Sequence, residues 1–568
     1  MNKTKKLTFV FILFLSVQFS YCQDLTSNIE KIKGLLKEVE TGKDLNVQKI
    51  DYPRENTIVF TRNVKKSNEK SSTVEYTFTL SDIDIASLQE YTDRDLIYID
   101  LTVKGLEKFI KVKEDNKPNP YVSSIRIFAK NIENARLLKD NFIAAIKLAE
   151  QIKSTKKLPT TYTACMEWLG TWIKPSNENS KTCKQQFSYE LTNPGHATLN
   201  RTVIGNKNNT QFIYDFNFAD INPQSVIVEI VGTTLSVKAN TISDEPYVKV
   251  NKDATFQYFE NEIKVYCDEL ETAREMTTIF KTIIPLSKEK VEAAFPTVTN
   301  ISQIIPLLNK LVSRVDEADK KYEQVFSGDC LNKLTKTAIL KDGVKTQEVW
   351  SFNFSDIDDK LLEMQISGSS LFIYLPTVNN TKFIKLETNG LFDSYNESVN
   401  LQCNNIDDAR VVKYLLNRGI QYCKEHPVDL CPKGTVEEKI DWLMSQINNA
   451  KFISTSLVQK LERFPSSKMF KFTSKELTSN GSKESVYEFD WSDIDYAGTT
   501  FEITNNYLGI KMQTTELRKI INCSKDGNIK NYVFELSIQF NDIEVSKAAH
   551  KVIKEIITSK TKPVNTPK

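Results

Sequence analysis

Histidine and cysteine are the residues of this chain that could take part most directly in chemistry. A general base, a metal triad or a nucleophile–base pair needs a well-placed imidazole or a pair of carboxylates. The chain of 568 residues has three histidines, and His196, His426 and His550 lie in unrelated sequence settings. We therefore expect surface histidines, and the sequence predicts no catalytic residue.

The cysteines are more informative. Eight follow residue 22, and eight cysteines allow 105 complete pairings. Cys267 and Cys403 lie on the apolar phase of matching sequence stretches, which predicts buried thiols outside any disulfide. Cys423 and Cys431 flank a proline-bearing joint and are candidates for a local disulfide. Paired C-x-x-C spacing is missing, so we predict no zinc site.

A short acidic motif recurs four times. It reads YTFTLSDID (76–84), YDFNFADIN (214–222), WSFNFSDID (350–358) and YEFDWSDID (487–495). An Asp-x-Asp pair could bind a divalent cation, but two carboxylates are few, and Asn222 replaces the second one in one copy. We interpret the motif as structural and predict no metal site.

Glycine patterns indicate no cofactor. Neither G-x-G-x-x-G nor G-x-x-x-x-G-K-[ST] occurs, so nucleotide binding lacks sequence support. The stretch SGSS at Ser367 to Ser370 is typical of a turn between strands rather than of a nucleophile loop. We predict no cofactor-binding residue.

The motif requires a strand to position it. Tyr487, Phe489 and Trp491 alternate with acidic residues, which predicts one face on a core and one in water. The aspartate after the strand is expected to accept hydrogen bonds from backbone N–H groups just downstream, as in an Asx-turn. The isoleucine that follows it is expected to return to the core: Ile83, Ile221, Ile357 and Ile494.

The motif aspartates indicate a repeat of domain size. Asp82, Asp220, Asp356 and Asp493 are separated by 138, 136 and 137 residues. The predicted fold class is α+β, with four tandem repeats of about 137 residues. Each repeat is expected to hold an N-terminal helix, a strongly bent antiparallel sheet and a C-terminal helix. The predicted modules span residues 24–153, 159–290, 297–426 and 433–558, followed by a polar tail, 559–568.

Hydrophobic periodicity predicts the elements of each module. An N-terminal helix is expected around Ile29 to Val39, and matching helices around Cys165 to Ile173, Ile304 to Val315 and Val436 to Ile447. In the first module, Tyr121 to Ala129 is expected to form one strand, and Ile132 to Glu150 the closing helix. Loops that differ between the modules, such as Leu191 to Asn209 and Leu375 to Lys382, are expected to carry specificity.

The strand-to-helix passages YVSSIRIFAKNIENARLLKDNFIAAI (121–146) and YVFELSIQFNDIEVSKAAHKVIKEII (532–557) resemble the pleckstrin-homology-like superfold, including its bacterial and GRAM-type relatives. The resemblance covers about 90 residues of each module, and the N-terminal helix departs from it. It implies a binding scaffold and nothing catalytic.

The first 22 residues are typical of an export signal. Three lysines precede the apolar run Leu7 to Phe19, and Ser20 to Cys22 resembles a cleavage site. Lipidation at Cys22 is the less favoured alternative, because Tyr21 is bulky. Removal of these residues leaves 72 basic and 73 acidic side chains, so nucleic acid is not an expected partner. No later run of apolar residues is long enough to span a membrane.

These features predict a non-enzymatic, tandem-module binding or scaffold protein of the bacterial cell envelope. We expect it in the periplasm or on the envelope rather than in the medium. Its expected partner is an envelope protein, a glycan or an apolar ligand. The alternatives are a carrier of an apolar ligand, or a hydrolase with its site in one divergent module.

Overall fold

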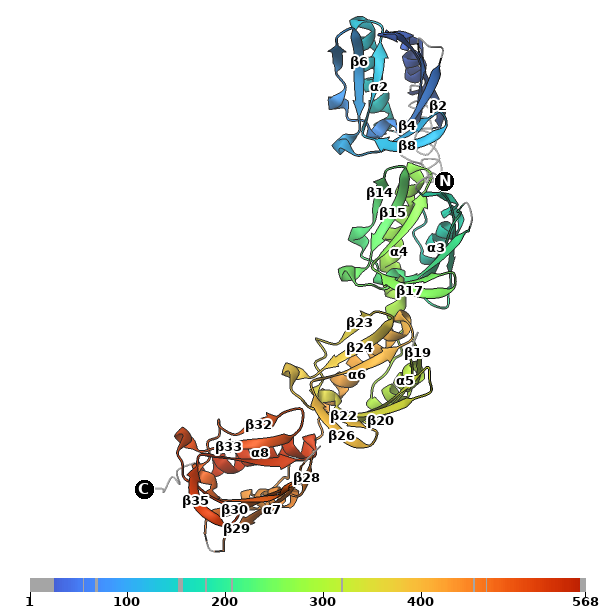
Figure 1. The fold of residues 1–568 in the computed structure, drawn as a ribbon. Coiled ribbons are helices and arrows are strands. Elements are labelled where there is room, and N and C mark those ends of the chain that lie inside the picture. Colours follow the sequence, from blue (N-terminus) through green and yellow to red (C-terminus); the bar gives the residue numbers. More distant parts are fainter. Residues whose placement is uncertain are drawn as a thin grey trace, which may run out of the picture. The chain divides into compact units, whose positions relative to one another are not determined.

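The computed structural model describes residues 25–561 except 55, 67–69, 152–156, 179–180, 206–207, 318–319, 453–454 and 466. The predicted export signal, with Cys22, lies outside the described residues, as do residues 562–568 of the predicted tail. The chain divides into two compact units, Met1–Ala294 and Phe295–Lys568. Figure 1 shows both units, which we describe separately.

The first unit contains two sheet pairs, each made of a six-stranded and a three-stranded antiparallel sheet. In the first pair the sheets are β1-β2-β3-β4-β7-β8 and β5-β6-β9, and in the second β10-β11-β12-β13-β16-β17 and β14-β15-β18. The strands of the first pair are β1 (Val39–Thr41), β2 (Asp44–Arg54), β3 (Thr57–Lys65), β4 (Ser71–Thr79), β5 (Glu90–Asp93), β6 (Leu96–Thr102), β7 (Ile110–Glu114), β8 (Lys117–Val122) and β9 (Ser124–Ala129). Those of the second are β10 (Ser176–Glu178), β11 (Lys181–Tyr189), β12 (His196–Val203), β13 (Thr210–Asn217), β14 (Ile227–Val231), β15 (Thr234–Asn240), β16 (Val248–Lys252), β17 (Thr255–Glu260) and β18 (Glu262–Cys267).

The second unit contains the third and fourth sheet pairs, with the same strand orders. The third pair comprises β19 (Arg314–Asp316), β20 (Lys320–Gly328), β21 (Leu331–Leu340), β22 (Lys345–Asn353), β23 (Glu363–Ser367), β24 (Ser370–Pro376), β25 (Ile384–Thr388), β26 (Leu391–Asn396) and β27 (Ser398–Cys403). The fourth comprises β28 (Ala450–Lys451), β29 (Ser456–Arg463), β30 (Met469–Thr478), β31 (Gly481–Asp490), β32 (Thr500–Ile503), β33 (Leu508–Gln513), β34 (Ile521–Lys525), β35 (Asn528–Val533) and β36 (Glu535–Phe540). The three-stranded sheets here are β23-β24-β27 and β32-β33-β36.

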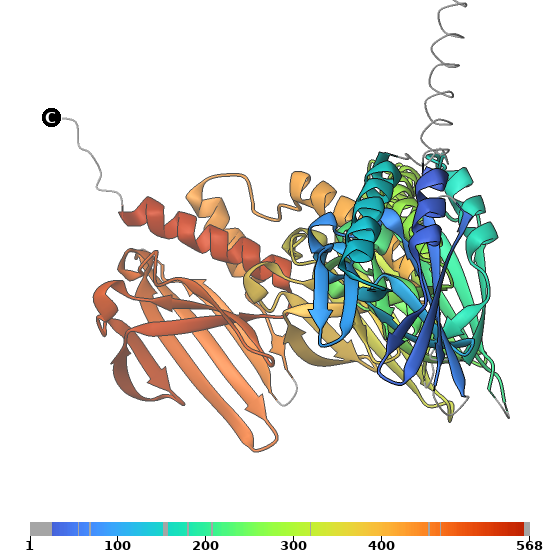
Figure 2. The ribbon, with the colours of Figure 1, turned by 90° about the horizontal axis from the view of Figure 1, so that it is seen from above.

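Amphipathic helices complete each core. Residues 25–35 are helical, and the named helices are α2 (Ile132–Gln151), α3 (Tyr162–Trp172), α4 (Leu270–Ala293), α5 (Ile301–Val312), α6 (Ile406–Glu425), α7 (Val436–Gln446) and α8 (Ile543–Thr561). In the fourth pair, α8 packs on β33, β36 and α7, and Figure 2 shows it along one face of the pair. A capping box between Thr435 and Glu438 begins α7.

The predicted fold class is wrong. Among the described residues, strand dominates, with 46% strand and 31% helix, in eight helices and eight sheets. The chain does not resolve clearly into four modules of about 137 residues with one bent sheet between flanking helices. Two sheets lie where one bent sheet was expected. The predicted module boundaries stay a prediction, as does the resemblance to the pleckstrin-homology-like superfold.

The physical reason lies where the chain changes sheets. The stretch Tyr121 to Ala129, predicted as one strand, is divided at Ser123 between β8 and β9, which belong to different sheets. Val39 and Val315, predicted on helices, lie instead in the short strands β1 and β19. Side-chain alternation reports which face of a strand is buried but not which strands pair, because pairing joins residues far apart in the chain. The closing helix predicted from Ile132 is confirmed as α2.

The strand expected in the acidic motif is confirmed. Phe489 and Trp491 are each 1% exposed, and Phe472 packs in the same core cluster. Full burial of one such side chain stabilises a fold by roughly 1.5–3 kcal/mol. The isoleucine after each motif aspartate is also buried, as expected, and forms an isolated bridge to the three-stranded side of the pair.

Candidate binding groove in the fourth sheet pair

The Asx-turns of the acidic motif are made by a different residue from the one expected. The motif aspartates lie in short 3-10 turns: η1 (Leu80–Asp82), η4 (Phe218–Asp220), η7 (Phe354–Asp356) and η9 (Trp491–Asp493). The residue two positions later accepts the downstream backbone N–H, at 3.0–3.3 Å: Asp84, Asn222, Asp358 and Asp495. Asparagine serves here as well as aspartate because only one acceptor oxygen is needed.

Two motif aspartates instead join neighbouring sheet pairs within a unit. In the first unit, Arg274 of α4 donates to Asp82 at 2.9 Å and is held by Glu271 at 2.8 Å. In the second unit, Lys547 of α8 donates to Asp356, and Glu544 holds it at 2.7 Å. In these two copies, the motif is therefore part of the packing between sheet pairs. Among the described residues, no group of three or more His, Cys, Asp or Glu side chains could hold a metal ion.

The cysteines follow the expectation only in part. Cys267 and Cys403 are buried and outside any disulfide, as predicted. The local bridge between Cys423 and Cys431 is wrong, because Cys423 of α6 pairs with Cys330, which precedes β21. The sequence separation of this disulfide is 93 residues, so spacing along the chain could not reveal it.

The histidines lie apart and differ in burial. His426 is exposed and stacks on Tyr422. His196 and His550 are partly buried rather than at the surface, and the ring of His550 hydrogen-bonds the Thr499 carbonyl at 3.0 Å. Burial lowers the pKa of His550. The SGSS stretch is a turn, as predicted, between β23 and β24. Of the predicted specificity loops, residues 191–209 include strand β12, and residues 375–382 include the end of β24 and a 3-10 turn, Val378–Asn380.

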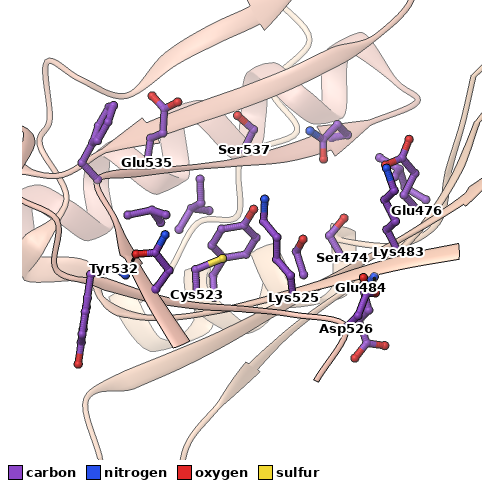
Figure 3. Close-up of a pocket in the computed structure, with 18 of the residues that line it drawn as sticks. Ser474, Glu476, Lys483, Glu484, Cys523, Lys525, Asp526, Tyr532, Glu535 and Ser537 are labelled. Atoms are coloured by element: carbon purple, nitrogen blue, oxygen red, sulfur yellow. Dashed lines mark hydrogen bonds between the residues drawn. The ribbon is translucent and has the colours of Figure 1, made fainter. Parts of the chain in front are cut away.

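A groove in the second unit lies between the two sheets of the fourth pair. This groove has a volume of about 730 Å³. Ser474, Tyr487, Cys523 and Lys525 line it from the inner face of the six-stranded sheet. Figure 3 shows Glu535 and Ser537 on the strand opposite Ser474, Cys523 and Lys525.

Strand β36 forms the opposite wall of the groove and is the last strand of its sheet. The side chains of Glu535 and Ser537 on this strand make their contacts on the outer face of the three-stranded sheet, away from the groove. Glu535 pairs with Lys511 at 3.0 Å, and Ser537 donates to Glu502 at 2.8 Å. The wall that β36 presents to the groove is therefore mainly its backbone edge.

A buried glutamine already uses part of this edge. Gln459 of β29 donates to the Gln539 carbonyl at 2.9 Å and accepts from the Gln539 N–H at 3.0 Å. The other sheet pairs repeat this double hydrogen bond, at 2.8–3.1 Å: Gln48 with Phe128, Gln185 with Tyr266 and Gln324 with Gln402. The side-chain amide thus stands in for one residue of a neighbouring strand.

Ser474 distinguishes the fourth sheet pair from the other three. In each pair, one strand residue lies eight positions before the motif aspartate, and the neighbouring antiparallel strand places one residue directly opposite it. That opposite residue is Arg62 in the first pair, Arg201 in the second, Lys336 in the third and Ser474 in the fourth. The three basic side chains lie over aromatic rings. Arg201 is 4.3 Å from the ring centre of Tyr214 and is 6% exposed. The equivalent groove of the second sheet pair, which Arg201 lines, measures about 260 Å³.

The same arrangement occurs in the first and third pairs. The guanidinium of Arg62 lies 5.2 Å from the ring centre of Phe128, and the ammonium of Lys336 lies 5.1 Å from that of Tyr322. Burial lowers the pKa of Lys336. A small hydroxyl side chain in place of these long cations leaves the groove of the fourth pair open. The sequence signal for this site is a basic residue on the core-facing phase of the same strand in three sheet pairs, with serine at that position in the fourth. Sequence reasoning missed this signal.

The groove is polar, and no activated nucleophile lies among the described side chains that line it. Burial raises the pKa of the Cys523 thiol and of the Tyr487 phenol, so both are protonated at neutral pH. Lysines and carboxylates both line the groove, including Lys483, Lys525, Glu476 and Glu484. This mixture suits a ligand bound by hydrogen bonds rather than one of a single charge.

Comparison with protein-family models and with curated proteins finds no match to this chain. None of the helices in the described part of the chain is long and apolar enough to cross a membrane.

Proposed function

We propose that this chain is an exported, non-enzymatic binding protein of the bacterial cell envelope, and that its ligand lies in the groove of the fourth sheet pair. The observation that carries the proposal is the open groove of about 730 Å³ at Ser474, where the second sheet pair holds a buried cation and the first and third hold partly buried ones. Convergent hydroxyl, amide and charged groups without an activated nucleophile favour binding over turnover.

The disulfide supports the proposed export. Disulfides persist in oxidising compartments such as the periplasm and are rare in the cytosol. Cys330 and Cys423 form one in the second unit, which agrees with the export signal predicted at residues 1–22. The polar groove gives less support to the alternative of a carrier for an apolar ligand, because such a carrier needs an apolar cavity.

Groove filling tests the proposal. Ser474→Arg introduces the side chain that the second sheet pair accommodates over Tyr214, here beside Tyr487. Thr473→Arg is the matched control, because adjacent residues of a strand face opposite sides. Residues 23–568 of each variant are used as bait on envelope extracts. We expect a component retained by the wild type and by Thr473→Arg but not by Ser474→Arg. Equal retention by all three would place any ligand elsewhere.

A further inference from the structure

We propose that the groove of the fourth sheet pair takes an extended polypeptide segment, which adds as a fourth strand to the free edge of β36. The inference deepens the proposed function and rests on it. It names the ligand class as peptide, where the proposed function leaves the ligand open.

The backbone of β36 is oriented for such pairing. In an antiparallel strand, the N–H and C=O of one residue point to the same side, and the side alternates along the chain. The Phe534 carbonyl accepts from Thr514 at 2.9 Å on the β33 side, whereas Gln539 bonds to Gln459 on the other side. Glu535 and Ser537 share the phase of Gln539. Their backbone groups therefore point into the groove.

The chain itself demonstrates the contact. The Gln459 amide makes with Gln539 the pair of hydrogen bonds that a neighbouring peptide group would make. A bound segment would extend this pattern from Gln539 to Ser537 and Glu535. Four residues of strand cover about 13 Å, so a segment of about five residues would donate and accept up to four hydrogen bonds with those two residues.

The other groups of the site leave room for this segment. The Glu535 and Ser537 side chains are turned to Lys511 and Glu502 on the outer face, so they do not cover the edge. Alternate side chains of the segment would meet Ser474, Tyr487 and Cys523 on the inner face of the six-stranded sheet. Main-chain hydrogen bonds would supply affinity and these small polar contacts would supply specificity.

A displayed library of random octapeptides tests the inference on residues 23–568. We expect selected peptides to bind wild type and Thr473→Arg alike, and Ser474→Arg at least tenfold more weakly. N-methylation at alternate peptide positions should weaken binding at least tenfold in one register and little in the other, because only one set of N–H groups faces β36. Hydrogen exchange of the amides of Glu535 and Ser537 should slow when peptide binds.

Ser537→Pro provides a second variant should Ser474→Arg unfold, which a thermal melt would reveal. It removes a groove-facing N–H without removing a ladder hydrogen bond to β33, and peptide binding should again weaken. Three results would overturn the inference. They are equal weakening of peptide binding by N-methylation in both registers, peptide binding that neither Ser474→Arg nor Ser537→Pro changes, and a library that yields no peptides binding the wild type better than Ser474→Arg.

A glycan library, used in parallel, separates this inference from the proposed function. Glycans that bind wild type and lose binding in Ser474→Arg, without any such peptide, would overturn the peptide ligand and leave a binding function for the groove. Failure of both libraries to show binding sensitive to Ser474→Arg would overturn both.

Discussion

Single buried polar side chains organise each sheet pair. Gln459 is 5% exposed and bonds to the backbone of Gln539 and to the Asn448 carbonyl at 3.1 Å. It links the six-stranded sheet to the edge of the three-stranded sheet and to the chain that leaves α7. A glutamine amide is suited to this position because it offers both donors and an acceptor.

Gln459→Leu should destabilise the second unit. The substitution leaves the N–H and C=O of Gln539 without their partner, and an unsatisfied buried polar group costs about 1–3 kcal/mol. We expect a loss of unfolding free energy in that range in urea titrations. Gln347→Leu is the matched control, since Gln347 is exposed, and its effect should stay below about 0.5 kcal/mol. Equal effects of the two substitutions would contradict the role assigned to Gln459.

At the scale of elements, a 3-10 turn of one sheet pair contacts a helix of the next pair. The turn η7 places Asp356 beside the N-terminal part of α8, where Glu544 and Lys547 lie. Phe383 packs over the ammonium of Lys547 at 4.6 Å. Burial raises the pKa of Asp356 to about 6 from 3.8, against the opposing effect of Lys547. The junction therefore contains a carboxyl group that titrates in a mildly acidic range.

This titration predicts a pH dependence of stability. Between pH 3.8 and about 6, the folded chain binds more protons at Asp356 than the unfolded chain does. The contribution is fully present below pH 3.8 and is lost as pH rises through the folded pKa, by up to about 3 kcal/mol. Asp356→Asn should remove this part of the dependence. Urea titrations of both proteins at pH 4, 5, 6 and 7 check it, and a constant difference between them would refute it.

The chain is organised as two compact units at the scale of the whole molecule. The boundary falls after α4, at Ala294 and Phe295. Phe295 stacks on Tyr414 of α6 at 4.6 Å, so it packs within the second unit. Each unit has its own hydrophobic clusters. The disulfide between Cys330 and Cys423 lies entirely within the second unit.

Fragments 23–294 and 295–568 should therefore fold separately. We expect each to show a cooperative thermal transition and protected amides in hydrogen exchange. Reductant should lower the transition of fragment 295–568 only, because a disulfide closing a loop of 93 residues contributes about 2–4 kcal/mol. A fragment that remains unfolded, or a reductant effect on fragment 23–294, would show that the units are not independent.

Local patterns in the sequence were sufficient for several features. Apolar periodicity predicted α2, and alternation predicted the buried face that carries Phe489 and Trp491. The apolar phase predicted the buried thiols Cys267 and Cys403. These features depend on residues close together in the chain, whose spacing sets which side of an element they occupy. The prediction of export and of a binding function stays a prediction.

Tertiary structure alone decided the remainder. The division of residues 121–129 between two sheets, the pairing of Cys330 with Cys423, and the contact of Asp356 with Lys547 all join segments far apart in sequence. The groove has the same origin. In the sequence, Ser474 is an ordinary strand residue. Only the tertiary structure places the edge of β36 opposite it. Which strand pairs with which, and which edge stays open, follows from packing of the whole unit rather than from local spacing.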